Sequence, residues 1–136
     1  MPRIMAIDYG QKRVGLAVTD PLKIIASPLD TVPTSGIMQF LDQYLAKEEV
    51  EKIIIGMPYR ADGSLPQWAD QIQSFAEKLQ KKFPDIEIEF VDERYTSKMA
   101  QQALISGGFK KKDRRKKENL DRISATIMLQ EYLGII

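Results

Sequence analysis

The spacing of hydrophobic and polar residues along this chain predicts five short strands. They are residues 3–8, 13–20, 27–32, 51–56 and 86–91. The first two are joined by a polar turn and predict a hairpin. Pro28 indicates that the third lies at an edge of the sheet, because proline has no backbone N–H to donate to a neighbouring strand. The run Ile53-Ile54-Ile55 indicates a strand buried on both faces, whereas the last stretch alternates apolar and acidic residues and predicts one exposed face.

Apolar residues at helical spacing predict four helices. They are a helix capped by Thr34 or Ser35, residues 67–83, a helix capped by Thr96 or Ser97 and ended by Gly107-Gly108, and residues 119–133. A hairpin followed by strands that alternate with helices predicts a mixed sheet with helices on both faces. Residues 1–136 contain no repeat or linker, so we expect one α/β domain.

The composition narrows the chemistry that this domain can perform. The 136 residues include neither histidine nor cysteine, which excludes Ser-His-Asp and Cys-His nucleophilic sites and thiolate or imidazole zinc sites. Carboxylates and a hard cation such as magnesium are what remain. No apolar run is long enough to span a membrane and no signal peptide is evident, so the expectation is a cytoplasmic protein without a membrane partner.

The charge is concentrated in one segment. Residues 110–117 hold seven basic residues and one acidic residue, a net +6, so the remaining residues sum to −5 in a chain of net charge +1. A basic segment on a mildly acidic body predicts a polyanionic partner, although a solvated loop without a partner is the simpler alternative. The predicted phosphate-binding residues are Lys110, Lys111, Lys112, Arg114, Arg115, Lys116 and Lys117, together with Arg13 and Arg94 near the acidic residues.

Acidic residues stand where predicted strands end. Asp8 ends the first strand and Asp92-Glu93 follow the last, and the carboxyl ends of parallel strands meet at one edge of a sheet. Asp121 falls near the start of the last helix, whose small Ser124 and Ala125 would allow a close approach to the sheet. Each acid also has a simpler explanation: a capped turn for Asp8, a surface ion pair for Glu93, and a charge at the helix N-terminus for Asp121.

Carboxylates that converge without histidine repel one another unless cations neutralise them. Two magnesium ions about 4 Å apart can activate a water and stabilise the leaving oxygen in phosphodiester cleavage. A group of carboxylates beside a basic segment therefore indicates a nuclease, with the acids as metal ligands and the basic residues on the phosphates.

The motifs of this chain resemble those of the YqgF family, also called RuvX-like, of candidate Holliday junction resolvases and candidate pre-16S rRNA nucleases. The matching residues are Asp8-Tyr9-Gly10, Arg13-Val14-Gly15-Leu16-Ala17, Asp20, Gly56-Met57-Pro58, Asp62-Gly63, Asp92-Glu93-Arg94, Thr96, Ala100, Lys117, Asp121, Ser124-Ala125 and Leu129-Gln130-Glu131-Tyr132-Leu133. The resemblance implies a ribonuclease H-like fold with a five-stranded mixed sheet in the order 3-2-1-4-5. It also implies a metal site in which Asp8, Glu93 and Asp121 hold Mg²⁺ or Mn²⁺ and are catalytic.

Two details stand apart from the family pattern. The last motif often has two alanines where this chain has Ser124-Ala125, and both residues are small. The alternation of Ile86, Ile88 and Phe90 places Asp92 on their face, whereas the resemblance favours Glu93 as the ligand. The choice between the two acids stays open on sequence alone.

The leading hypothesis is a metal-dependent endonuclease that cleaves structured nucleic acid, foremost precursor 16S ribosomal RNA in ribosome biogenesis. The alternatives are a resolvase of branched DNA in recombination and repair, a phosphotransferase of the sugar-kinase type, and a non-catalytic protein that binds RNA or ribosomal particles. A resolvase would need two active sites, so both a monomer and a homodimer are open.

Overall fold

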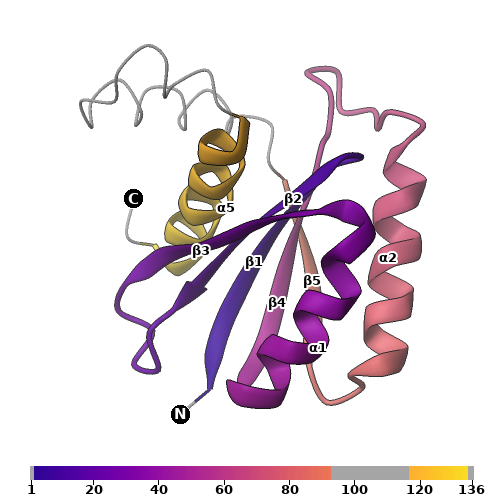
Figure 1. Cartoon of the computed structure of the whole chain (residues 1–136). Coiled ribbons are helices and arrows are strands. Elements are labelled where there is room, and N and C mark those ends of the chain that lie inside the picture. Colours follow the sequence, from indigo (N-terminus) through magenta and orange to yellow (C-terminus); the bar gives the residue numbers. More distant parts are fainter. Residues whose placement is uncertain (1, 93–116, 135–136) are drawn as a thin grey trace.

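The computed structural model describes residues 2–92 and 117–134 of the chain. Its sheet contains β1 (Arg3–Tyr9), β2 (Arg13–Thr19), β3 (Ala26–Pro33), β4 (Val50–Met57) and β5 (Glu87–Asp92). The strand order is β3-β2-β1-β4-β5, with β1, β4 and β5 parallel and β2 antiparallel to both neighbours (Figure 1). The predicted mixed sheet and its implied order are confirmed.

The position of each strand follows from its residues. Ile53, Ile54 and Ile55 are completely buried in β4, which lies between β1 and β5, so the prediction of a strand buried on both faces is confirmed. Pro28 belongs to β3, which is an edge strand as predicted. The β2–β3 register shifts between Leu16 and Ala17, where the ladder accommodates this proline strand.

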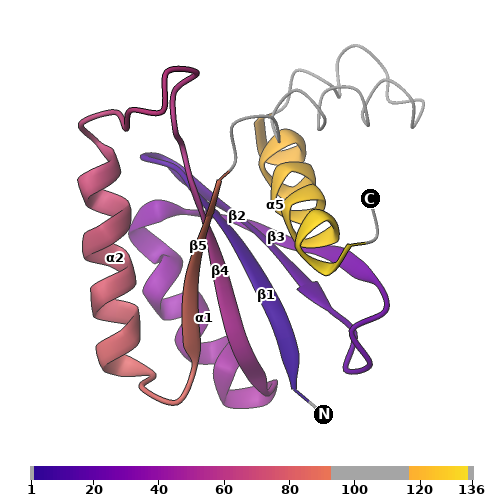
Figure 2. The same ribbon diagram turned by 180° about the vertical axis from the view of Figure 1, so that it is seen from behind.

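Helices cover both faces of the sheet. The helices α1 (Ile37–Lys47) and α2 (Ala69–Lys82) lie on one face, and α5 (Lys117–Leu133) lies on the other (Figure 2). The core beneath α1 and α2 is built from large side chains such as Met5, Ile7 and Leu16. Among the described residues it is the larger of two buried apolar clusters, and such burial stabilises the fold.

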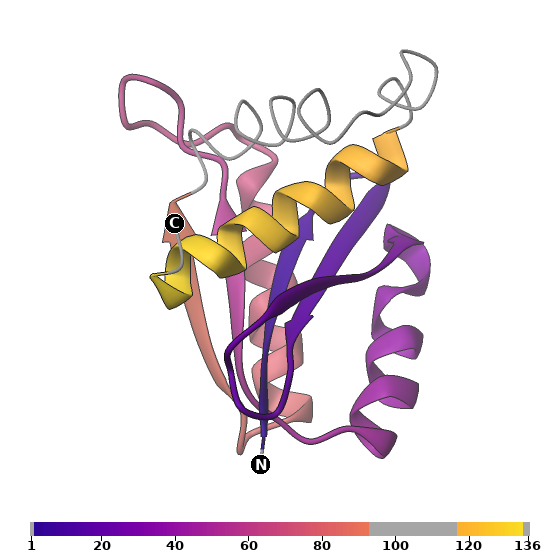
Figure 3. The ribbon, with the colours of Figure 1, turned by 90° about the vertical axis from the view of Figure 1, so that its left-hand side faces the viewer.

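The core beneath α5 uses small residues. Ala6, Ala17 and Ala26 of the sheet pack with Ala125 of the helix, together with Ile4, Ile54, Met128 and Leu129. Small side chains allow the helix backbone to approach the strands closely. The helix crosses the sheet obliquely and packs against β1, β2 and β3 (Figure 3).

Several predicted helix ends differ from those observed. The helix predicted after Thr34 or Ser35 is confirmed as α1, but its predicted cap is wrong: Thr34–Gly36 form a 3₁₀ turn, and α1 begins after Gly36 without a side-chain cap. The last helix is described from Lys117, so it includes at least two residues before the predicted start. The helix predicted between Thr96 or Ser97 and Gly107-Gly108 lies outside the described residues.

Within the described part of the chain, no helix combines the length and apolar character needed to cross a membrane.

Candidate active site at the carboxyl edge of the sheet

The parallel strands β1, β4 and β5 end at one edge of the sheet, which we call the carboxyl edge (Figure 1). Asp8 is the next-to-last residue of β1, and Asp92 is the last residue of β5. The segment between β4 and α2 and the N-terminal end of α5 lie at the same edge (Figure 1). Ligands of α/β sheets bind at such edges, because several strand ends and loops can contribute side chains there.

Asp8 belongs to the face of the sheet that α5 covers. Its carboxyl group continues the alternation of Ile4 and Ala6, which both pack beneath α5. Gly15 of β2 lies directly opposite Asp8. On the other side Gly56 is level with it, because the preceding residues Ile7 and Ile55 are paired. Neither neighbouring strand therefore places a side chain beside Asp8, and the Asp8 carboxyl group lies in a gap between two glycines.

The turn that follows Asp8 is held by backbone geometry. Gly10 N–H donates to the Arg13 carbonyl over 2.9 Å, and a Cβ on Gly10 would lie 2.6 Å from that oxygen. The Thr34 hydroxyl donates to the Gly10 carbonyl over 2.7 Å, and Thr34 N–H donates to the Lys12 carbonyl over 3.0 Å. Thr34, predicted as a helix cap, therefore fixes the β1–β2 turn instead.

Tyr9 anchors the end of β1 from the opposite face. Its ring lies 4.8 Å from that of Phe75 on α2, measured between centroids. Burial raises the pKa of the Tyr9 hydroxyl above its ordinary value, so this group stays protonated at neutral pH. Asp8 thus lies between the buried residues of β1 and the anchored Tyr9, which limits the freedom of its backbone.

The helix α5 approaches the face that carries Asp8. Ser124 and Ala125 are both buried, as their small size predicts. Asp121 belongs to α5 and lies one helical turn before Ala125. It is at least the fifth residue of α5, so the alternative of a first-turn charge at the helix N-terminus loses its basis.

Asp92 belongs to the other face of the sheet. It pairs with Met57 of β4, whose side chain lies in the core beneath α1 and α2. It also shares its face with Ile88 and Phe90, as the alternation predicted. A hollow of about 350 Å³ at this point is lined by Tyr59, Gly63, Phe90, Val91 and Asp92. The side chains of Asp8 and Asp92 therefore belong to opposite faces of the same edge.

Most of the other predicted site residues lie outside the described residues. Among them are Glu93 and Arg94, and the basic residues Lys110, Lys111, Lys112, Arg114, Arg115 and Lys116. Lys117 is the first described residue of α5. Arg13 is the first residue of β2, at the carboxyl edge and beside the turn that Gly10 makes.

The residues present suit a hard divalent cation. Asp8 offers carboxylate oxygens in a gap left by two glycines, and the sequence contains no histidine or cysteine that would favour a softer metal. Among the side chains that the structure describes, no three acidic ones are close enough together to hold an ion by themselves.

A polar cluster near the end of α5 had no signal in the sequence. Tyr132 donates to Glu89 over 2.8 Å, and Lys52 contacts both Glu89, at 2.9 Å, and the Tyr132 hydroxyl. The hydrogen bonds with Tyr132 and then Glu89 raise the pKa of Lys52. The bond from Lys52, followed by that from Tyr132, lowers the pKa of Glu89. The cluster ties α5 to β4 and β5.

The sequence matches a family model described as "RuvX: Holliday junction resolvase" over residues 2–134. A protein of Flavobacterium psychrophilum, named as a candidate pre-16S rRNA nuclease, is 54% identical over 133 residues, which cover 98% of this chain and 97% of that protein. A protein of the same name from Amoebophilus asiaticus is 56% identical over 134 residues, which cover 98% and 95% of the two chains.

Two solved structures share the fold. The Fowlpox virus resolvase in complex with Holliday junction DNA matches with a TM-score of 0.60 at 14% identity, covering 98% of this chain and 97% of that one. Thermus thermophilus RuvC in complex with a Holliday junction matches with the same TM-score at 12% identity and the same coverage. These likenesses confirm the predicted ribonuclease H-like fold. Together with the family match over nearly the whole sequence, they lead to one conclusion: the chain belongs to the RuvX family.

Proposed function

We propose that this protein is a metal-dependent endonuclease that cleaves precursor 16S ribosomal RNA during ribosome biogenesis in the cytoplasm. The observation that carries the proposal is the position of Asp8, at the carboxyl edge of β1, on the face covered by α5, between Gly15 and Gly56. A carboxyl group in such a gap can be reached by a cation and by the phosphate of a large substrate.

The metal ligands in this proposal are Asp8, Glu93 and Asp121. Glu93 is preferred to Asp92 because Asp92 belongs to the face of the sheet opposite Asp8. Asp121 is preferred because α5 packs on the face that carries Asp8 and begins near the carboxyl edge. When bound, Mg²⁺ or Mn²⁺ supplies charge stabilisation at the cleaved phosphate and lowers the pKa of an attacking water.

The protein's own residues orient the site and bind the substrate. The hydrogen-bonded β1–β2 turn and the Tyr9 anchor hold Asp8 in place, so that little reorganisation is needed when a substrate binds. The basic residues are proposed to bind the phosphates on either side of the cut, where each contact adds affinity that falls with salt. They are Arg13, Arg94, Lys110, Lys111, Lys112, Arg114, Arg115, Lys116 and Lys117.

The RNA substrate is favoured by the names of the relatives at 54% and 56% identity. Cleavage of branched DNA is the second candidate, favoured by the description of the family itself. A junction resolvase cuts two strands symmetrically and would need a homodimer with two sites. An RNA nuclease can work as a monomer on a ribosomal particle. The two candidates therefore differ in the oligomeric state that they require.

The test is to deplete the protein in its host and map the 5′ and 3′ ends of 16S rRNA by sequencing. Unprocessed precursor ends should accumulate, expression of the wild-type protein should restore mature ends, and the Asp8→Asn protein at equal abundance should not. Restoration by Asp8→Asn would contradict the nuclease proposal and favour a non-catalytic RNA-binding role.

The matched in vitro assay offers precursor rRNA and a synthetic four-way junction to the purified protein in Mg²⁺ or Mn²⁺. Cleavage of the rRNA alone supports the first candidate. Cleavage of the junction alone, with a dimer in solution, would overturn it in favour of the resolvase.

A further inference from the structure

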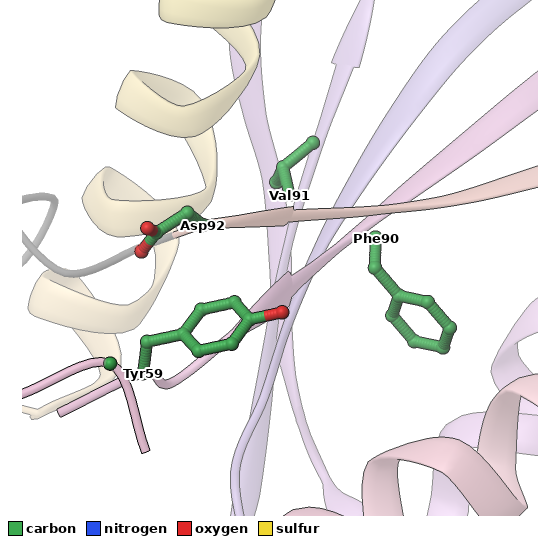
Figure 4. A pocket seen from close by; sticks show the side chains of 5 residues that line it. Tyr59, Phe90, Val91 and Asp92 are labelled. Atoms are coloured by element: carbon green, nitrogen blue, oxygen red, sulfur yellow. The ribbon is translucent and has the colours of Figure 1, made fainter. Parts of the chain in front are cut away.

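The hollow beside Asp92 lies at the carboxyl edge, on the face opposite the proposed metal site. It has a volume of about 350 Å³ and is lined by Tyr59, Gly63, Phe90, Val91 and Asp92. Phe90 and Val91 leave β5 on opposite sides, and Tyr59 lies on the side of Phe90, near Asp92 (Figure 4). Two aromatic rings and one carboxylate thus surround a space next to the end of β5.

Phe90 is exposed where the pattern of the sequence predicts a buried side chain. It alternates with acidic residues as an inward-facing residue does, yet 43% of its surface is accessible. It is the one aromatic residue among the four large hydrophobic side chains exposed in the described residues. The other three, Leu22, Ile24 and Ile25, lie in the β2–β3 connection, so Phe90 is not part of their patch.

The other side of the hollow is a preformed turn. Arg60 N–H donates to the Ser64 carbonyl over 2.7 Å, and Gly63 N–H donates to the Arg60 carbonyl over 2.9 Å. The Asp62 carboxylate accepts bonds from the N–H and the hydroxyl of Ser64, at 2.9 and 2.6 Å. Gly63 has a φ of +87°, which other residues adopt only with strain. The loop that holds Tyr59 is therefore ordered before any ligand binds.

We propose that this hollow binds one unpaired nucleobase of the nucleic-acid substrate, stacked against Phe90 and Tyr59. The proposal rests on the proposed nuclease function and adds a preference for single-stranded segments beside the cut. Aromatic faces stack on any base, and a carboxylate accepts hydrogen bonds from exocyclic amino groups of bases, so Asp92 suits a base that carries one. Arg60, exposed next to Tyr59, provides a positive charge in the same loop for the phosphate.

A paired base is unsuited to this position. Its faces are covered by the neighbouring base pairs, so Phe90 and Tyr59 could not stack on it, and its Watson–Crick edge is occupied by the partner base. Burial of one base would therefore select single-stranded RNA or an unstacked end over a continuous duplex. This selection arises from side chains on β5 and on the loop after β4, and none of them is a proposed metal ligand.

The test measures binding without metal, so that it is independent of cleavage. A single-stranded RNA carrying one 2-aminopurine, whose fluorescence is quenched by stacking, is titrated with wild-type protein, and its duplex form is titrated in parallel. We expect quenching with the single strand only. The Phe90→Leu variant should lose the quenching and bind the single strand about fivefold or more weakly, with unchanged affinity for the duplex.

Two further variants make the result interpretable. Phe90→Trp retains an aromatic face and should retain quenching. Leu22→Ala removes a comparable exposed hydrophobic side chain away from the carboxyl edge and should bind like the wild type. Thermal unfolding of each variant confirms that it is folded. Equal quenching by Phe90→Leu and the wild type, or equal losses for single strand and duplex, would overturn the base site, while the metal-dependent cleavage proposed above could still hold.

Discussion

Asp8 and Asp92 lie in the last two residues of parallel strands at the same edge of the sheet, yet their side chains belong to opposite faces. The register requires this, because Asp92 pairs with Met57 on one face while Asp8 is level with Gly56 and continues the alternation of Ala6 on the other. The two carboxylates are therefore assigned to different tasks. Asp8 belongs to the proposed metal site and Asp92 to the proposed base site.

This division predicts different kinetic defects for the two acids. Asp92→Asn should raise KM for a single-stranded substrate severalfold and leave kcat nearly unchanged, because Asp92 would bind the base equally well in the ground state and the transition state. Asp8→Asn should lower kcat. Steady-state cleavage assays at several RNA concentrations distinguish a change in KM from a change in kcat. A fall in kcat with unchanged KM for Asp92→Asn would show that Asp92 takes part in the chemical step instead.

The β1–β2 turn predicts a strong effect of Gly10→Ala. A methyl group there would approach the Arg13 carbonyl oxygen to 2.6 Å, so the hairpin must distort next to Asp8. We expect a loss of about 2 kcal/mol in the free energy of unfolding, measured by urea titration, and reduced cleavage.

Gly36→Ala is the matched control for that substitution. A Cβ at Gly36 meets nothing within 4 Å, and its φ of −106° is accessible to alanine. The free energy of unfolding should change by no more than about 0.5 kcal/mol. Alanine is a weaker N-cap than glycine, which destabilises the fold, but it also reduces the entropy of the unfolded chain, which stabilises the fold. Equal losses for the two variants would refute the close approach at Gly10.

The close packing of α5 predicts that Ala125→Leu disturbs the site from a distance. Ala125 is completely buried against Ala6 and Ala17, so a larger side chain must push the helix away from the sheet. The expected cost is about 1–3 kcal/mol of stability, with a larger loss of cleavage than of RNA affinity. Glu131→Leu, on the exposed side of the same helix, should be near neutral in both assays.

The cluster of Lys52, Glu89 and Tyr132 predicts a dependence of stability on pH. The lowered pKa of Glu89 means that its ionised form is favoured in the folded state. Its contribution is present above the ordinary value of 4.5 and is lost as the pH falls through the lower folded value. The difference in melting temperature between wild type and Glu89→Gln should therefore be constant near neutral pH and shrink in acid. A difference that persists unchanged in acid would exclude this linkage.

The basic segment predicts electrostatic binding that does not depend on sequence. Replacing Lys110, Lys111 and Lys112 by glutamine should weaken binding to all RNAs alike. It should also make the slope of log K against log salt concentration less steep, by about 0.7 to 0.9 for each phosphate that is no longer neutralised. Lys47→Gln and Lys81→Gln, on exposed ends of α1 and α2, are the control. Filter-binding at several salt concentrations makes the comparison, and equal slopes in both proteins would remove the segment from the interface.

Much of the fold was predictable because its signals are local. The isoleucine run of β4 indicates a central strand and the proline of β3 indicates an edge strand, even when the neighbouring strands are unknown. The prediction that Asp8 and Asp92 lie at one edge of the sheet is confirmed, because the ends of both strands are marked locally in the sequence. The family resemblance provided the strand order, which periodicity alone leaves open.

The predictions were wrong or incomplete where contacts between residues far apart in the sequence determine the position of a side chain. Thr34 has the chemistry of a helix cap, but its hydroxyl binds the carbonyl of Gly10, 24 residues away. Phe90 alternates like a core residue, but β5 is the last strand of the sheet and leaves the ring exposed. The contact of Lys52 with Tyr132 spans 80 residues and had no local pattern. Glu93 as a metal ligand stays a prediction.

The central claim is that the carboxylate of Asp8 is required for chemistry. The most direct measurement is the single-turnover rate of precursor 16S rRNA cleavage, with Mg²⁺ and saturating protein, for wild type, Asp8→Asn and the exposed control Asp85→Asn. We predict a loss of about 100-fold or more for Asp8→Asn with RNA affinity retained, and a wild-type rate for Asp85→Asn. An Asp8→Asn protein that cleaves at the wild-type rate would contradict the account.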